Sequence, residues 1–189
     1  MSLALVSALL APLVTIGSWI VSPLMWAEFS SRRQTISALA ARGAPSRRVQ
    51  SASFVVSGLC YVVSAMAISD LGTLGRLTLA AGGIALIGVA AAPLPTPDDS
   101  SVAHSRVAGG HFVAMALWPL AGMVTSEGAP WLLTPWGAAA SSALLLVLLA
   151  VFLVNLRRET AVVGLTERVV AGAMTLWPLV LVLVLTFGR

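Results

Sequence analysis

The sequence predicts an all-α membrane protein: a six-transmembrane-helix bundle with a short interfacial helix between helices 1 and 2. Three observations predict this fold class. Only 10% of the 189 residues are charged and 58% are hydrophobic, whereas soluble domains carry roughly 25% charged residues. Apolar runs of about 20 residues recur along the chain, which is the length that crosses a membrane as a helix. These runs do not alternate in polarity, so helices are favoured over barrel strands.

The chain length is compatible with a single domain, residues 1–189. The first predicted helix, residues 3–26, has no basic segment before it. It is also too long for the core of a signal peptide, so it is interpreted as a membrane span. The other five spans are predicted at residues 49–68, 77–92, 103–125, 133–156 and 165–187. Glycines at 82, 83 and 88 predict that the third of these six helices packs closely against a neighbour.

The interfacial helix is predicted in the long polar connection after the first span. Thr35 is a suitable N-cap and Gly43, followed by Pro45, is a suitable end. Between them, one stripe of the helix is apolar: Ile36, Leu39 and Ala40. A short helix of this kind is expected to lie in the membrane interface rather than to cross the membrane.

The arginines predict the sidedness. All eleven basic residues are arginines, and with six spans nine of them share the side of the first, third and fifth connections: Arg32, Arg33, Arg42, Arg47, Arg48, Arg106, Arg157, Arg158 and Arg168. The positive-inside rule makes this side cytoplasmic, with both termini outside, in the plasma membrane. Arginine at helix ends indicates topology and headgroup contact, so the basic pI does not indicate a nucleic-acid partner.

Most of the other ionisable residues lie on the same side. These are Glu28, Asp98, Asp99, His104, Glu159 and Glu167, with His111 deeper in the fourth helix. This asymmetry does not depend on which way the protein is inserted. We therefore expect any binding site to lie near the arginine-rich side.

The fourth helix carries both histidines. His104, His111 and Trp118 are spaced by seven residues and so share one face. His111 lies roughly 10 Å deeper than His104, too far for both to ligate one metal, and no metal site is predicted. Two interpretations of His111 stay open. It hydrogen-bonds a backbone carbonyl freed by a neighbouring proline, or it accepts a proton or binds a ligand beneath a polar mouth.

The turn before this helix supplies the candidate catalytic residues, Asp98, Asp99 and His104. Two carboxylates and an imidazole can act as an acid–base pair or hold a divalent ion. Alternatively, the aspartates are solvated or cap the following helix, a role that Ser100 or Ser101 can also fill.

Arg32 and Arg33 precede the N-terminus of the interfacial helix, where backbone N–H groups and guanidinium groups together suit a lipid phosphate. The alternative is unspecific anchoring to anionic headgroups. Glu167 and Arg168 are expected to pair with each other or with Asp98 or Arg106.

An internal repeat relates the fourth and sixth helices. Residues 114–120 (AMALWPL) recur as residues 173–179 (AMTLWPL). The two copies cross the membrane in the same direction, and each proline frees a carbonyl one turn earlier. Either the repeat is a reused kink anchored by Trp118 and Trp177, or it marks two related helices that line one cavity.

No cofactor is identified, because the sequence has no P-loop, dinucleotide fingerprint, zinc-protease motif or cysteine cluster. Its one cysteine, Cys60, lies in an apolar run and is interpreted as a packing residue.

A family resemblance rests on residues 34–40 (QTISALA), followed by Gly43-Ala44-Pro45 and Arg47. This segment resembles the TISxLA…GAP region of the bacterial integral-membrane family called domain of unknown function 998, in its actinobacterial branch. The glycine-rich third helix, His104, and Glu167-Arg168 upstream of Leu176-Trp177-Pro178 are similar to the same family. The resemblance covers essentially the whole chain. It implies a six-helix bundle and no particular activity.

These observations lead to one hypothesis and two alternatives. The protein is expected to bind a lipid or another amphipathic small molecule in a cavity that opens at the arginine-rich face. The residues expected to contribute are Arg32, Arg33, Thr35, Ser37, His104, Arg106, His111, Trp118, Glu167, Arg168 and Trp177. The alternatives are an intramembrane enzyme acting on a lipid headgroup, and an assembly subunit that docks on a protein partner or on a second copy of itself.

Overall fold

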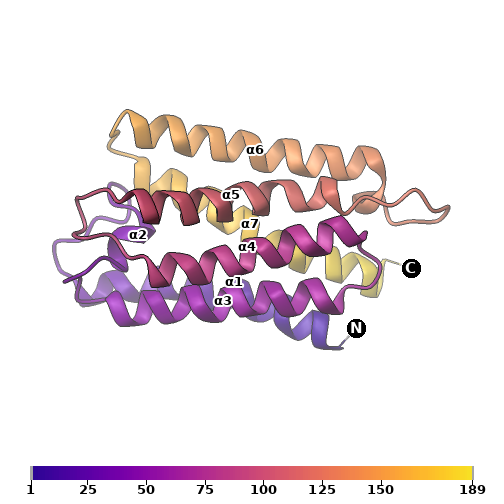
Figure 1. The fold of residues 1–189 in the computed structure, drawn as a ribbon, viewed down its shortest axis with the longest axis horizontal. Helices are drawn as coiled ribbons and strands as arrows, with labels where there is room; N and C mark the ends of the chain where they lie inside the picture. The colour runs from indigo at the N-terminus through magenta and orange to yellow at the C-terminus, as the bar shows by residue number, and fades with distance from the viewer. Residues whose placement is uncertain (1, 189) are drawn as a thin grey trace.

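A computed structural model describes residues 2–188, and these residues form seven α-helices and two short 3-10 turns, with no strand among them (Figure 1). The helices are α1 (Ser2–Val21), α2 (Ile36–Leu39), α3 (Arg47–Ala67), α4 (Thr73–Ala91), α5 (Val102–Ala121), α6 (Pro135–Arg157) and α7 (Val163–Phe187). The 3-10 turns are η1 (Ser22–Met25) and η2 (Trp131–Leu133). The predicted all-helical fold is confirmed.

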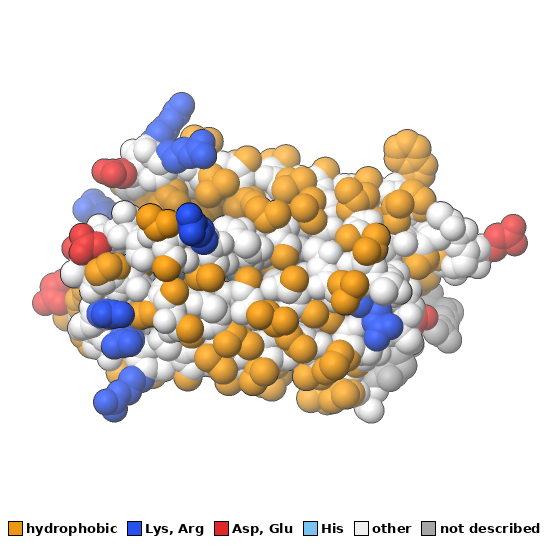
Figure 2. Space-filling view, viewed as in Figure 1, with side chains coloured by type: hydrophobic (Ala, Val, Ile, Leu, Met, Phe, Trp, Pro, Cys, Tyr) orange, Lys and Arg blue, Asp and Glu red, His pale blue; other side chains and the backbone are white. Residues whose placement is uncertain are grey.

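The six long helices lie side by side and alternate in direction along the chain (Figure 1). The connections after α1, α4 and α6 therefore gather at one end of the bundle, together with α2, and the two ends of the described chain lie at the other. This is the grouping of connections that the sequence predicted. Figure 2 shows most of the visible arginine side chains at the α2 end, with hydrophobic side chains covering the middle of the bundle. We call the α2 end the arginine-rich end.

Five helices are long and apolar enough to cross a membrane: α1 with its η1 extension (Ser2–Met25), α3, α4, α6 and α7. Their outward faces are apolar, and each of them carries exposed leucine, valine or isoleucine side chains. Helix α5 is 20 residues long and is not among these five; it carries His104, Arg106 and His111. Five of the six predicted spans thus have the hydropathy expected of a membrane helix.

Small residues let the helices approach closely. A Cβ atom added to Gly83 of α4 would lie 2.5 Å from the carbonyl oxygen of Gly58 in α3, so neither position has room for a side chain. This confirms the close packing predicted from the glycines of this helix. Close packing of this kind holds helices together in a membrane, because the hydrophobic effect does not drive helices to associate in lipid.

Polar side chains join α1 to α3. The bonded pairs, which we call the serine ladder, are Ser7–Ser64 (2.8 Å), Thr15–Ser57 (2.7 Å), Ser18–Ser53 (2.8 Å), Gln50–Ser18 (3.2 Å) and Ser22–Gln50 (3.2 Å). These polar groups lie inside the bundle, where they are bonded to one another, as expected for a chain surrounded by lipid.

The short helix α2 forms where it was predicted. Thr35 Oγ1 accepts a hydrogen bond from the Ala38 N–H at 3.2 Å, so Thr35 is the N-cap. The apolar stripe, however, does not face a membrane, because Ile36, Leu39 and Ala40 are all buried by the protein. The expectation of a helix that lies on the interface is corrected: α2 packs into the end of the bundle, against α7.

Candidate functional site

A cavity of about 50 Å³ lies directly against α2. It is enclosed by residues of α1, α3, α4, α5 and α7, with Ile36 and Ser37 of α2 forming one wall. Its polar lining consists of Thr15, Ser37, Tyr61, His111 and Glu167. We call it the α2 cavity. A single water needs roughly 10–15 Å³ of such volume, so the cavity has room for a few waters or one small polar group.

His111 lines this cavity from α5. Its Nδ1 lies 2.9 Å from the carbonyl oxygen of Gly82. A carbonyl only accepts hydrogen bonds, so in a neutral ring Nδ1 carries the proton and Nε2 offers a lone pair. The ring stacks on Tyr61, with 6.2 Å between centroids, and leans on Phe112 at 5.5 Å. The predicted bond to a carbonyl is present, but α4 contains no proline, so this carbonyl belongs to a regular helix.

His104 lies two turns nearer the arginine-rich end of α5 than His111, and both of its ring nitrogens form hydrogen bonds. Its Nδ1 donates to the Ala92 carbonyl at the C-terminus of α4 at 2.9 Å, and its Nε2 lies 3.0 Å from Ser37 Oγ. The side chain is 6% exposed. His104 therefore connects α2 to α4 and α5 and has no free nitrogen for a metal or a substrate.

The aspartates of the predicted catalytic group do not join His104. Asp98 and Asp99 are exposed in the turn before α5, whereas the His104 ring points into the bundle. The N-cap of α5 is Ser101, whose Oγ accepts from the His104 N–H at 3.4 Å. Across residues 2–188 no group of three or more His, Cys, Asp or Glu side chains is arranged to hold a metal ion.

Glu167 and Arg168, in the second turn of α7, hold the connection between α1 and α2. Glu167 Oε2 accepts a hydrogen bond from the Ile36 N–H at the start of α2. Arg168 Nη1 donates to the carbonyls of Ser31 (2.7 Å), Gln34 (3.0 Å) and Gly164 (2.9 Å). The predicted alternative partners, Asp98 and Arg106, are exposed elsewhere at this end.

The N-terminus of α2 is already occupied. Glu167 takes the Ile36 N–H and Thr35 takes the Ala38 N–H. An anion at this position would face the Glu167 carboxyl group. Arg32 and Arg33 are exposed side chains on the turn before α2, where they can reach headgroups but do not enclose a pocket.

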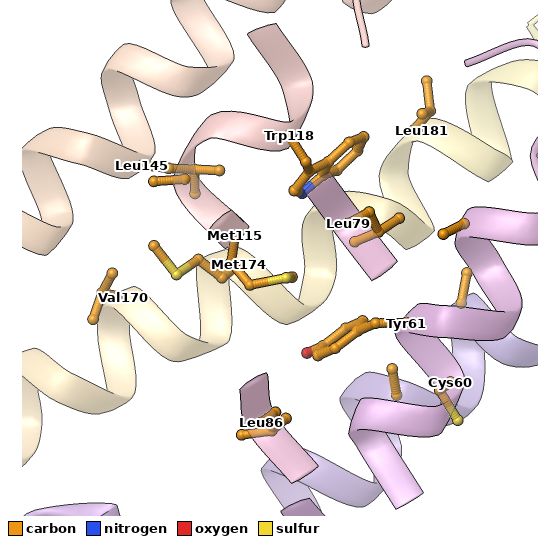
Figure 3. Close-up of a cluster of buried hydrophobic side chains, with 14 of the residues drawn as sticks. Cys60, Tyr61, Leu79, Leu86, Met115, Trp118, Leu145, Val170, Met174 and Leu181 are labelled. Carbon is orange, nitrogen blue, oxygen red and sulfur yellow. The ribbon is translucent and has the colours of Figure 1, made fainter. Parts of the chain in front are cut away.

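The two repeated tryptophans lie outside the α2 cavity. Trp118 is 1% exposed in the core beside Leu79, as Figure 3 shows, and its Nε1 has no hydrogen-bond partner. Trp177 is half-buried and packs against the same core. Helices α5 and α7 do both line the cavity, but through Ala108, His111, Phe112, Glu167 and Ala171.

Several lining residues escaped the sequence analysis. Tyr61 is the only tyrosine of the chain and lies wholly inside the bundle, among Met115, Met174, Leu79 and Leu86 (Figure 3). Thr15 bonds Ser57 of the ladder at 2.7 Å. One signal was available: Gln50, Ser53, Ser57 and Ser64 recur at intervals of three, four and seven residues, so they mark a polar face of α3.

A second cavity of about 420 Å³ lies at the opposite end, between the α5–α6 connection and the end of α7. It contains Asp70 and Glu127 and none of the predicted site residues. Both carboxylates are exposed, whereas the ionisable groups of the α2 cavity are buried.

Comparison with curated proteins and with solved structures finds no match. The family model described as "Protein of unknown function (DUF998)" matches residues 9–184, which include α2, His104, His111 and Glu167. The resemblance inferred from residues 34–47 is therefore confirmed over nearly the whole chain, and the protein belongs to the DUF998 family.

Proposed function

We propose that the protein crosses the plasma membrane six times and binds the polar end of a lipid or another amphipathic small molecule in the α2 cavity. One observation carries this proposal: Glu167 (4% exposed) and His111 (8% exposed) line the same cavity inside an apolar helix bundle. Ionisable side chains are costly within a membrane, and they mark binding sites or transport paths there.

The sixth span in this proposal is α5. Its 20 residues match the length of its neighbours, and it packs between α4 and α6. His104 and His111 face the protein interior, while Val113 and Leu120 are exposed on the outside. The polar residues that lower the hydropathy of α5 therefore need not contact lipid. By the positive-inside rule, the arginine-rich end lies in the cytoplasm.

The size of the α2 cavity supports partial insertion of the ligand. About 50 Å³ accommodates a small polar group and no acyl chain. The alkyl part stays in the bilayer, and exposed Arg32 and Arg33 contact any phosphate at the membrane surface. Because α2 separates the cavity from the arginine-rich end, it moves aside when the ligand enters. The enzyme alternative has less support, since Asp98 and Asp99 are exposed and both His104 nitrogens are engaged.

Native mass spectrometry of the purified full-length protein tests the proposal. Ala171→Leu fills the α2 cavity, and Ala143→Leu adds the same side chain to an exposed position of α6 as the matched control. We expect an amphipathic molecule to be retained by the wild type and the control and lost from Ala171→Leu. Arg32→Ala combined with Arg33→Ala weakens retention. A folded wild-type protein that retains nothing from any added membrane lipid contradicts the proposal.

A further inference from the structure

We infer that the polar group recognised by the α2 cavity is a primary ammonium group, an inference that rests on the proposed function and names its ligand class. The hydrogen bonds of the polar side chains around the cavity fix which atoms carry protons. His111, Ser37 and Glu167 each present a hydrogen-bond acceptor to the cavity, the hydroxyl groups of Thr15 and Tyr61 complete its polar lining, and no arginine side chain lines it.

His111 presents the first acceptor. Its Nδ1–H is committed to the Gly82 carbonyl at 2.9 Å. In the neutral ring this leaves Nε2 as a lone-pair acceptor.

Ser37 presents the second acceptor. The Ala92 carbonyl fixes the proton of His104 on Nδ1, so His104 Nε2 is an acceptor. The Ser37 hydroxyl, 3.0 Å from that nitrogen, must therefore donate its only proton to it. What remains on Ser37 Oγ for the cavity is a lone pair.

Glu167 presents the third acceptor. Its Oε2 accepts the Ile36 N–H, and a carboxylate has further lone pairs to offer. The neighbouring Arg168 is not among the lining residues: its Nη1 donates to three backbone carbonyls outside the cavity, and its Nε and Nη2 are buried with no hydrogen-bond partner. A phosphate or carboxylate ligand would thus meet the charge of Glu167 and the lone pairs of His111 and Ser37, with only the hydroxyl groups of Thr15 and Tyr61 to donate to it.

A primary ammonium group has three N–H donors for these three acceptors. The apolar part of the lining adds the aromatic rings of Phe54, Tyr61 and Phe112, which suit a cation. Alkali ions fit less well, since they prefer oxygen ligands and His111 offers a nitrogen. An ammonium group also fits a cavity of about 50 Å³.

Binding of single-chain probes to the purified full-length protein tests the inference. The probes are dodecylamine, its N-acetyl derivative and dodecyl phosphate, titrated by native mass spectrometry. A second arm compares phosphatidylethanolamine with its N-acetyl derivative, which distinguishes an aminolipid headgroup from a free alkylamine. We expect the amine to bind at least about tenfold more tightly than the amide in whichever arm contains the natural class.

Two substitutions make the test specific. Glu167→Gln keeps an oxygen for the Ile36 N–H and removes the charge, so it should abolish the preference for amine over amide. Glu159→Gln, on the exposed α6–α7 connection at the same end, should leave the preference unchanged. Circular dichroism confirms that each variant is folded.

Each outcome is decisive. A preference for amine that depends on Glu167 supports both the inference and the proposed function. A second outcome is that Ala171→Leu abolishes binding, but the protein shows no preference for the amine or favours the phosphate. This overturns the inference and leaves the proposed function standing. If no probe binds in a way that Ala171→Leu abolishes, both the inference and the proposed function are overturned.

Discussion

The serine ladder and the α2 cavity use buried polar groups in opposite ways. In the ladder, hydroxyl and amide groups of α1, η1 and α3 bond one another at 2.7–3.2 Å, and of these residues only Thr15 also lines the α2 cavity. Around the α2 cavity, His111 and Glu167 each make one hydrogen bond to the backbone and keep acceptor capacity beside open space. Polar groups that hydrogen-bond one another hold helices together. Polar groups that keep a free hydrogen-bond acceptor beside a cavity are available to bind a ligand.

This difference separates stability from binding. Ladder substitutions should lower the free energy of unfolding without changing the ligand, whereas substitutions in the α2 cavity should abolish binding at small cost in stability. Interhelical hydrogen bonds in membrane proteins contribute about 0.6 kcal/mol each on average. Leaving a buried partner unsatisfied costs about 1–3 kcal/mol.

Gln50→Leu should have the largest effect on stability. Gln50 bonds both Ser18 and Ser22 and is fully buried, so its loss leaves Ser22 without its partner. We expect the free energy of unfolding in mixed micelles to fall by about 2 kcal/mol. Ser51→Ala, on the same helix but outside the ladder, is the control. Ligand retention should be normal in both variants, and its loss in a folded Gln50→Leu protein would break the comparison.

His111→Phe should cost less, about 1 kcal/mol, because one hydrogen bond is lost and the ring stacking is kept. Binding of the amphipathic ligand should disappear. His104→Phe is the informative partner, since it removes two hydrogen bonds and leaves the Ala92 carbonyl at the end of α4 unpaired. Thermal unfolding should rank His104→Phe as the less stable of the two. The opposite ranking would mean that His104 is not the structural histidine.

Features that depend on local sequence were predicted, and features that depend on distant contacts were not. Composition and arginine placement predicted the helices, their alternation and the arginine-rich end, because these depend on local hydropathy. Thr35 and Gly43 marked α2 for the same local reason. The partner of Glu167 could not be predicted, since Ile36 lies 131 positions away. Tyr61 lies four residues after Ser57 on the polar face of α3, which was the available signal, whereas no pattern identified Thr15 as a lining residue.

The interfacial interpretation of α2 failed for a related reason. An apolar stripe on a short helix suits a membrane surface and a protein interior equally well. Only the packing around Ile36 and Leu39 distinguishes the two, and that packing comes from α5 and α7, which lie far along the chain.

Ser64→Ala tests a single ladder bond far from the α2 cavity. It removes the 2.8 Å bond to Ser7. The free energy of unfolding should fall by about 0.6 kcal/mol, with ligand retention unchanged. The double variant with Ser7→Ala completes a mutant cycle. A coupling energy near zero would show that this pair adds nothing to the α1–α3 contact.

Ala171→Val should have the smallest effect on stability and a clear effect on binding. The added methyl groups occupy part of the α2 cavity, so the free energy of unfolding should change by no more than about 0.5 kcal/mol in either direction. Ligand affinity should fall in a binding titration. A variant that binds normally would show that the ligand lies elsewhere.

Photo-cross-linking with an alkylamine that carries a diazirine beside its ammonium group tests the central claim most directly. If the α2 cavity is the ligand site, peptide mapping will find the label on the α2 and α5 segments that contain Ile36, Ala108 and Phe112. The label will disappear in Glu167→Gln and persist in Glu159→Gln. Labelling spread over the exposed apolar faces of α1 and α6, equal in the wild type and Glu167→Gln, would contradict it.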